Sequence, residues 1–122
     1  LFDAFLLKEN HIVAAGSITG AIEAAKTAFP DKPVEIEVEN LAELTEAMAA
    51  GADIALIDNF SIADTQTAVA ISRGKMVLEA SGGITQGSIA EIARTGVDYI
   101  SCGDLTKGVE PLDLSMRFLL DQ

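Results

Sequence analysis

Short aliphatic runs alternate along this sequence with longer segments of helical periodicity, and this alternation restricts the possible fold more than any other feature. The predicted strands cover residues 4–8, 34–38, 54–58, 76–80 and 99–102. The predicted helices cover residues 18–29, 41–50, 62–73, 86–95 and 112–120. Because strand–helix repeats of this kind build parallel sheets with right-handed crossovers, the sequence predicts an α/β fold.

Residues that begin and end helices support these boundaries. Candidate N-caps precede four of the predicted helices, at Ser17, Asn40, Ser61 and Thr85. Glycines that could end helices in a left-handed conformation stand at Gly51, Gly74 and Gly96. A faint internal repeat, residues 51–54 (GADI) and 96–99 (GVDY), leads from a helix end into a strand in both copies.

The second predicted strand decides between two α/β architectures. It lies in the run PVEIEVEN (33–40), where Glu35, Glu37 and Glu39 share one face. A doubly wound sheet would cover this carboxylate row with helices, whereas the inside of a (β/α) barrel can be polar at its mouth. The row therefore favours a portion of a TIM-like barrel, with Glu35 deepest and in need of a polar partner.

The length of the chain fits only part of such a barrel. A complete barrel takes about 250 residues, and this chain has 122 residues. Its first residues also read as if they began within a strand. We therefore expect residues 1–122 to be a partial α/β-barrel catalytic domain, as a fragment or the ordered part of a longer protein.

Composition excludes several classes of partner. The formal net charge is −11, which argues against binding to nucleic acid or to an anionic membrane, because both need a basic surface. The sequence contains no apolar run long enough to span a membrane. One cysteine, Cys102, permits neither an internal disulfide nor a thiolate metal cluster. We therefore expect a protein of the reducing cytoplasm.

Polar residues collect at the carboxyl ends of the predicted strands, where parallel barrels place their active sites. They are Lys8, Asn10 and His11, then Glu37 and Glu39, then Asp58 and Asn59, then Glu79, Ser81, Gly82 and Gly83, and last Cys102, Gly103 and Asp104. Glycine-rich turns before a helix suit a phosphate. Carboxylates suit Mg²⁺ or sugar hydroxyls.

Taken singly, these residues have simpler interpretations. The SGG turn is a common one, His11 fits an ordinary hydrogen-bonded histidine, and Cys102 fits a small apolar strand residue. Lys8 is the exception, because a lysine that closes an aliphatic strand requires a partner or a ligand.

The succession of strand-end motifs resembles one family over essentially the whole chain. KENH (8–11), VEIEVEN (34–40), IDNF (57–60), LEASGG (78–83), TGVDYISCG (95–103) and LDLSMRF (112–118) occur in order and with compatible spacing. In these motifs the chain is similar to quinolinate phosphoribosyltransferase, the nicotinate-nucleotide pyrophosphorylase (carboxylating) of NAD biosynthesis.

The resemblance implies a reaction and a set of roles. The family joins quinolinate to phosphoribosyl pyrophosphate, releases pyrophosphate and CO2, and forms nicotinate mononucleotide with Mg²⁺. It implies that Lys8 binds a quinolinate carboxylate and that Glu37 and Asp58 contact the ribose or the Mg²⁺–pyrophosphate. It also implies that the turns at Ser81, Gly82 and Gly83 and at Cys102, Gly103 and Asp104 bind substrate, with the SGG turn and Gly103 holding the 5′-phosphate.

The chain also departs from the family pattern. The amino-terminal domain, the first barrel strands and further Arg, His and Lys residues that bind quinolinate and pyrophosphate are absent from it. We therefore expect the 122 residues alone to be inactive and the longer protein to be a homodimer or higher homo-oligomer. Two alternatives stay open: a related phosphoribosyltransferase with another acceptor, and a non-catalytic half-barrel that binds phosphate and self-associates through its open edges.

Overall fold

Six strands form one sheet in the computed structural model, which describes residues 4–102 and 116–119. The strands are β1 (Phe5–Leu7), β2 (Val34–Val38), β3 (Ile54–Asp58), β4 (Val77–Ser81), β5 (Tyr99–Cys102) and β6 (Met116–Leu119). The first five are parallel and adjacent in chain order, and β6 pairs antiparallel with β5. Strands that add in one direction through right-handed crossovers place their helices on the same side of the sheet.

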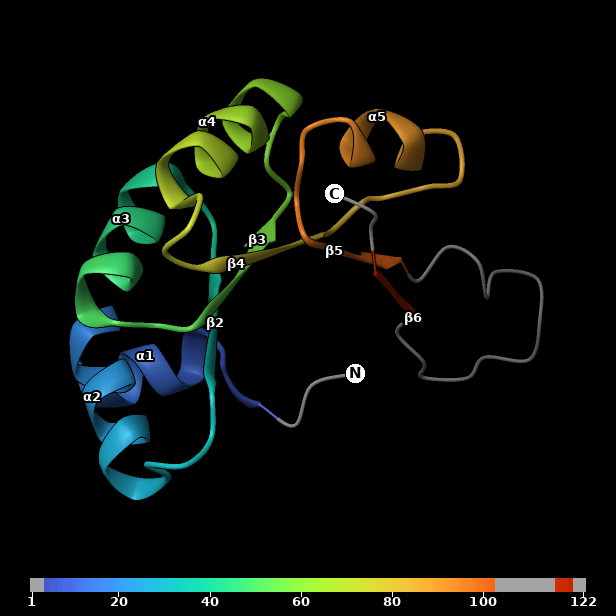
Figure 1. The fold of residues 1–122 in the computed structure, drawn as a ribbon. Helices are drawn as coiled ribbons and strands as arrows, with labels where there is room; N and C mark the ends of the chain where they lie inside the picture. Colours follow the sequence, from blue (N-terminus) through green and yellow to red (C-terminus); the bar gives the residue numbers. More distant parts are fainter. Residues whose placement is uncertain (1–3, 103–115, 120–122) are drawn as a thin grey trace.

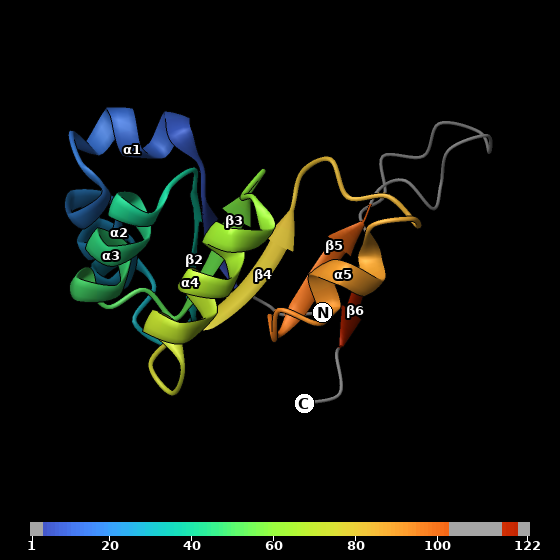
Figure 2. The same cartoon turned by 90° about the horizontal axis from the view of Figure 1, so that it is seen from above.

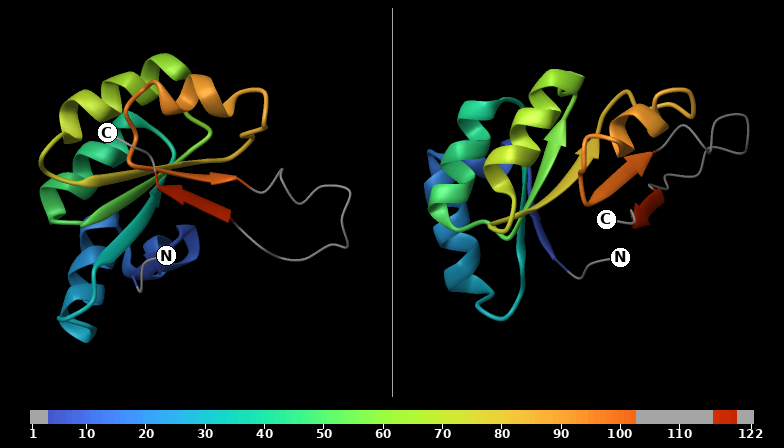
Figure 3. Two further views of the ribbon diagram at one scale, coloured as in Figure 1. Left: turned by 45° about the vertical axis from the view of Figure 1, so that its right-hand side comes forward. Right: turned by 45° about the horizontal axis from the view of Figure 1, so that its top comes forward.

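The helices follow this rule and curve around the outside of the sheet (Figure 1). They are α1 (Glu9–Ala15), α2 (Ile18–Ala28), α3 (Leu41–Ala50), α4 (Ile62–Ser72) and α5 (Ile89–Ala93). Figures 2 and 3 show that the other face of the sheet carries none of these described helices. The fold is therefore α/β with the arrangement of a partial (β/α) barrel, as predicted, and it is not doubly wound.

Alternate residues of the strands divide between the two faces of the sheet. Val34, Ile36 and Val38 are fully buried and belong to the core cluster between the sheet and the helices. Ile54 and Leu56 are also buried but lie outside that cluster. Because strand side chains alternate in direction, the glutamates of β2 share the inner face with Ile54 and Leu56. The prediction that the Glu row faces away from the helices is confirmed.

The predicted capping residues act at three helices. Oγ of Ser17, Oδ1 of Asn40 and Oγ of Ser61 each accept a hydrogen bond from the backbone N–H three residues on. Thr85 differs, because it closes a turn with Ser88 and α5 begins later than predicted. Gly51 ends α3 in the predicted left-handed conformation, with a φ of 90°.

Two predictions about helices need correction. Between the first two strands the sequence predicts a helix at 18–29 only, yet α1 occupies Glu9–Ala15. The helix predicted near 112–120 is wrong over Met116–Leu119, which form β6. Periodicity cannot separate helix from strand in so short an apolar run, and the edge of β5 supplies unpaired backbone groups that favour a strand.

The internal repeat, residues 51–54 and 96–99, forms hydrogen bonds between neighbouring strands near their amino-terminal ends. Asp53 donates its backbone N–H to Val34 O (2.9 Å), and Val34 N–H donates to Asp53 Oδ2 (2.8 Å). Asp98 forms the same pair of hydrogen bonds with Leu78, at 3.0 Å and 2.9 Å. In both copies one aspartate thus pairs with the backbone N–H and C=O of a residue at the start of the preceding strand, Val34 in β2 or Leu78 in β4. These hydrogen bonds fix the register of β2 with β3 and of β4 with β5.

We expect Asp98→Ala to destabilise the fold by about 1–3 kcal/mol, because it leaves the N–H of the buried Leu78 without its acceptor. Urea unfolding measures this change. Asp31→Ala is the matched control, since Asp31 is exposed and lies in the turn before β2, and its free energy of unfolding should change little. Equal losses in the two variants would contradict a registering role for Asp98.

No helix in the described part of the chain is both long enough and apolar enough to cross a membrane.

Candidate functional site

The register of the parallel strands brings the predicted site residues to one edge of the inner face. Glu37 pairs with Leu56, and Leu56 pairs with Glu79 on its other side. Two residues nearer the carboxyl ends of the strands, Asp58 pairs with Ser81. Residues paired in this way in a parallel sheet point to the same face. Three separate strand ends, β2, β3 and β4, therefore contribute polar side chains to a common surface.

Glu37 is the electrostatic centre of this surface. Its pKa is raised above the ordinary value of 4.5, first by burial and then by the negative charge of Asp58. Lys8 lowers the same pKa, while Glu39 and Glu9 raise it further. These influences act over short range, so Lys8, Glu37 and Asp58 form one interacting group. A cation or a cationic transition state would relieve the repulsion between its two carboxylates.

The sign of the shift has a consequence for stability. Because the folded chain holds the Glu37 proton more strongly than the unfolded chain, the contribution of Glu37 to stability is lost as the pH rises above 4.5 and through the raised pKa. At neutral pH the ionised Glu37 therefore opposes folding. A charge kept at such a cost is typical of functional sites.

We expect two variants to move the pKa of Glu37 in opposite directions. Asp58→Asn should lower it, because a repelling charge is removed, and Lys8→Met should raise it further, because the attracting charge is lost. Titration of the Glu37 carboxyl by carbon NMR measures both shifts, with Asp31→Asn as an unshifted control. Shifts of the same sign in both variants would contradict this arrangement.

Lys8 and His11 are joined through the start of α1. Lys8 is the N-cap of this helix, and its backbone N–H donates a hydrogen bond to Nδ1 of His11 (3.0 Å). The His11 ring also meets Phe5 edge-on, with ring centroids 6.3 Å apart. The interpretation of His11 as a hydrogen-bonded histidine is confirmed, and its bond fixes the backbone from which the Lys8 side chain extends.

The Ser81–Gly82–Gly83 turn packs against the end of β3. Ser81 Oγ donates to Asp58 Oδ1 (3.4 Å), and Asn59 N–H donates to Ser81 O (3.0 Å). Gly82 and Gly83 have φ angles of 80° and 62°, in the left-handed region that favours glycine. A Cβ at Gly82 would overlap Asp58 Oδ1, so this turn needs glycine for its conformation and for its close approach.

A cavity of about 220 Å³ opens beside this turn. Its polar lining includes Asn59, Ser81 and Ser88, together with the backbone of Gly82 and Gly83. Its walls also come from Phe60 and Ile84 and from α5. Polar groups and turn backbone at the carboxyl ends of β3 and β4 make this a place for a small anion or a sugar phosphate.

Two further carboxylates on the inner face, those of Glu35 and Glu79, are fully buried. Glu35 is 1% exposed and Glu79 is 0% exposed. Both residues interact with other groups of the fold, and a basic or hydrogen-bonding partner for the Glu35 carboxylate stays a prediction. Because both are buried whereas Glu37 and Asp58 are partly exposed, the accessible carboxylates of the group are those of Glu37 and Asp58.

The remaining predicted site residues lie at or beyond the end of β5. The structure describes the backbone of Cys102, and Gly103 and Asp104 lie outside the described residues. Asn59 is a predicted strand-end residue to which the sequence assigns no role. Its φ of 57° makes it the non-glycine residue with a left-handed backbone among those described.

A pair of carboxylates limits how a metal could bind. No group of three or more His, Cys, Asp and Glu side chains in the described ranges is arranged to hold a metal ion. Glu37 and Asp58 can still serve a Mg²⁺ ion that keeps water and phosphate oxygens in its shell, because such sites need one or two carboxylates.

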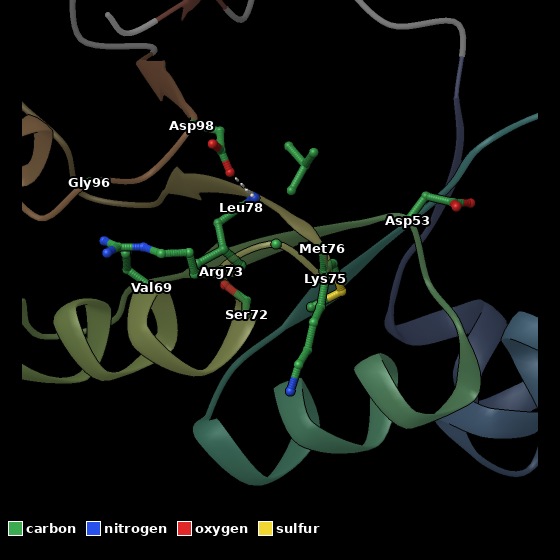
Figure 4. Close-up of a pocket in the computed structure, with 11 residues that line it drawn as sticks. Asp53, Val69, Ser72, Arg73, Lys75, Met76, Leu78, Gly96 and Asp98 are labelled. Atoms are coloured by element: carbon green, nitrogen blue, oxygen red, sulfur yellow. Dashed lines mark hydrogen bonds between the residues drawn. The ribbon is translucent and has the colours of Figure 1, made fainter. Parts of the chain in front are cut away.

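A second polar cavity, of about 370 Å³, lies at the opposite, amino-terminal ends of the strands (Figure 4). Asp53, Asp98, Arg73 and Lys75 line it. The two aspartates already accept strand N–H groups, and Figure 4 shows the Arg73 and Lys75 side chains extending in different directions. The charges of this cavity do not converge on one point, and we assign it a structural role.

Comparisons with known proteins show to which family the chain is similar. The sequence profile of the quinolinate phosphoribosyl transferase C-terminal domain matches residues 1–117. The nicotinate-nucleotide pyrophosphorylase (carboxylating) of Mycobacterium leprae is 40% identical over 119 residues, which are 95% of this chain and 42% of that protein. The protein of the same name from Dictyostelium discoideum is 41% identical over 122 residues, covering 96% of this chain and 40% of its own length.

A solved structure shows the same fold. The nicotinate-nucleotide pyrophosphorylase from Francisella tularensis superposes with a TM-score of 0.80 and 52% sequence identity, over 93% of this chain and 40% of that chain. The present chain thus spans about two fifths of the length of the relatives that it matches.

Proposed function

The chain belongs to the quinolinate phosphoribosyl transferase family through its C-terminal domain, and from this premise we propose that it supplies the catalytic barrel portion of a nicotinate-nucleotide pyrophosphorylase. The whole protein would transfer the phosphoribosyl group of phosphoribosyl pyrophosphate to quinolinate and release pyrophosphate and CO2. The observation that carries the proposal is the interacting group of Lys8, Glu37 and Asp58 beside the Ser81–Gly83 turn.

The proposed chemistry needs little from side chains beyond charge and position. As the bond from the ribose C1 to pyrophosphate breaks, the sugar acquires oxocarbenium character. Glu37 and Asp58, already close enough to repel one another, would stabilise that positive charge electrostatically and contact the ribose hydroxyls. Their mutual repulsion falls as the cation forms, so they bind the transition state more strongly than the ground state.

The acceptor is a dicarboxylate and requires a cation. Lys8 is exposed, and its backbone is held by His11. We assign it to one quinolinate carboxylate, which would orient the ring nitrogen toward C1. Once that nitrogen carries the ribose and is positively charged, it would stabilise the electron pair that the departing CO2 leaves on the adjacent ring carbon C2, and C2 would then take up a proton from water. The Arg, His and Lys residues that complete this charge balance in the family would come from the longer protein.

We assign the 5′-phosphate of the ribose to the carboxyl end of β4, beside the Ser81–Gly83 turn. The Ser81–Gly83 turn and the cavity of about 220 Å³ support this assignment, because turn backbone can approach an anion closely where no Cβ intervenes. We extend the proposal to Cys102, Gly103 and Asp104 because they end or directly follow β5 in the sequence, and β5 runs parallel to β4.

A Mg²⁺ ion bound with pyrophosphate would neutralise charge on the leaving group. Glu37 and Asp58 are the residues that would meet it, through water or phosphate oxygens. We also propose that the whole protein is a cytoplasmic homodimer or higher homo-oligomer. The single cysteine of the chain is in keeping with a reducing compartment.

Product analysis of the full-length protein tests the proposal. Purified enzyme is incubated with phosphoribosyl pyrophosphate and Mg²⁺, and with quinolinate or nicotinate as the acceptor. We expect nicotinate mononucleotide from quinolinate with equal amounts of CO2. Product from nicotinate alone would instead favour a related transferase with another acceptor, and binding of phosphate without product would favour a non-catalytic module.

The isolated chain provides a second expected result. Residues 1–122 contain eight lysines and arginines in total against nineteen acidic residues. They cannot balance a dicarboxylate and a pyrophosphate together, so we expect no pyrophosphate release above background from these residues alone. Turnover by the 122 residues would contradict this part of the proposal.

A further inference from the structure

We infer that Asn59 is a positioning residue that holds the Gly82–Gly83 turn in the conformation required for an anion; this rests on the proposed function of the turn as a phosphate site. Asn59 follows β3 directly, and the turn follows β4, so the two meet where neighbouring strands end. The role concerns the shape of the turn and not the reacting atoms.

The first support is contact with both glycines. A Cβ at Gly82 would lie 3.0 Å from Asn59 Cγ and 3.0 Å from Asn59 N. A Cβ at Gly83 would lie 3.2 Å from Asn59 Oδ1. The asparagine therefore fills the space on the side of the turn where ordinary residues would carry their side chains, and it prevents the turn from collapsing in that direction.

The second support is the backbone of Asn59 itself. Its φ of 57° is left-handed, which asparagine tolerates better than most residues other than glycine. In this conformation its N–H donates to Ser81 O (3.0 Å), one residue before Gly82. The same residue thus fixes the start of the turn through its backbone and the glycines through its side chain.

The third support comes from the backbone N–H groups of Gly82 and Gly83. Neither Gly82 N–H nor Gly83 N–H donates a hydrogen bond to another residue in the described ranges, although both border the cavity. Two donors that border a cavity and to which no described residue provides an acceptor suit an anion. Their directions depend on φ angles of 80° and 62°, which Asn59 restrains.

This role predicts weaker phosphate binding without a general loss of the site. Asn59→Gly keeps the left-handed backbone accessible but removes the side chain. In the full-length protein we expect its affinity for ribose 5-phosphate to fall by about tenfold, since part of the binding energy must then order the turn. The KM for phosphoribosyl pyrophosphate should rise similarly, while the KM for quinolinate stays within about twofold.

Asn40→Gly is the matched control. Asn40 also follows a strand, caps α3 through Glu43 N–H, and is not among the neighbours of the glycine turn. Its replacement should lower the melting temperature only slightly, because glycine is also tolerated at an N-cap, and should leave ribose 5-phosphate affinity unchanged. Asn59→Asp is a second variant, which keeps the shape of the side chain and, like asparagine, tolerates a left-handed backbone. It should fold normally but bind ribose 5-phosphate more weakly, because it adds a negative charge beside the phosphate.

Calorimetric titration with ribose 5-phosphate separates this inference from the proposed function. If the wild-type protein binds ribose 5-phosphate but forms no product, the proposed reaction fails and the Asn59 role is still measured by binding. Wild-type affinity in Asn59→Gly, or in Asn59→Asp if the glycine variant does not fold, would overturn the role of the side chain. Failure of the wild-type protein to bind ribose 5-phosphate would overturn it as well.

Discussion

Replacement of Glu37 by glutamine in the full-length protein is expected to lower kcat by about 10²–10³-fold, the range seen when one preorganised electrostatic contact is removed from an active site. Glutamine keeps the size and hydrogen-bonding capacity of the side chain but removes the charge. The KM for quinolinate should change little, because Glu37 acts on the ribose side of the reaction.

The same variant should fold at least as well as the wild-type protein. Because ionised Glu37 opposes folding at neutral pH, its replacement by glutamine is expected to raise the melting temperature. Lost turnover together with retained or increased stability distinguishes a catalytic role from a structural one. Near-normal kinetics in Glu37→Gln would remove this residue from the site.

Replacement of Gly82 by alanine is the second change with a large expected effect. The new Cβ would overlap Asp58 Oδ1 and approach Asn59, and alanine pays about 1–2 kcal/mol for a left-handed φ. The turn and Asp58 must therefore move apart. Since displacements of about 1 Å near the reacting atoms can cost 10²-fold in rate, we expect at least that loss of kcat/KM.

Gly87→Ala is the control for this experiment. Gly87 lies in the same connection between β4 and α5, where a Cβ would meet Thr85 Oγ1 at an ordinary 3.7 Å. Its substitution should leave kcat/KM within about twofold, as surface changes of this kind usually do. Steady-state kinetics and thermal melts of both variants provide the comparison. Equal activity in the two variants would show that the turn tolerates a side chain and is not a tight anion site.

Much of the fold follows from patterns that are local in the sequence. The bounds of β2, β3 and β5 agree with the prediction, because aliphatic runs between capping residues and glycines have few other interpretations. The helix α1 was missed because Lys8 is not an ordinary N-cap residue. Its backbone N–H instead donates to Nδ1 of His11, which takes the place that Glu or Gln usually occupies in a capping box.

The site could be predicted as a set of strand ends but not as a geometry. Sequence order placed Glu37, Asp58 and Ser81 after successive strands, and parallel strands bring such residues to one edge. The register that aligns Asp58 with Ser81 depends on long-range pairing. The left-handed backbone of Asn59 was also beyond prediction, because asparagine is compatible with ordinary backbone conformations as well.

The most direct test of the central claim, that this edge belongs to a quinolinate-consuming transferase, is the release of labelled CO2 from carboxyl-labelled quinolinate by the purified full-length protein. The site described here predicts release that depends on phosphoribosyl pyrophosphate, equals the pyrophosphate formed, and falls by about 10²–10³-fold in Glu37→Gln. Absence of release from the wild-type protein, or release without phosphoribosyl pyrophosphate, would contradict the claim.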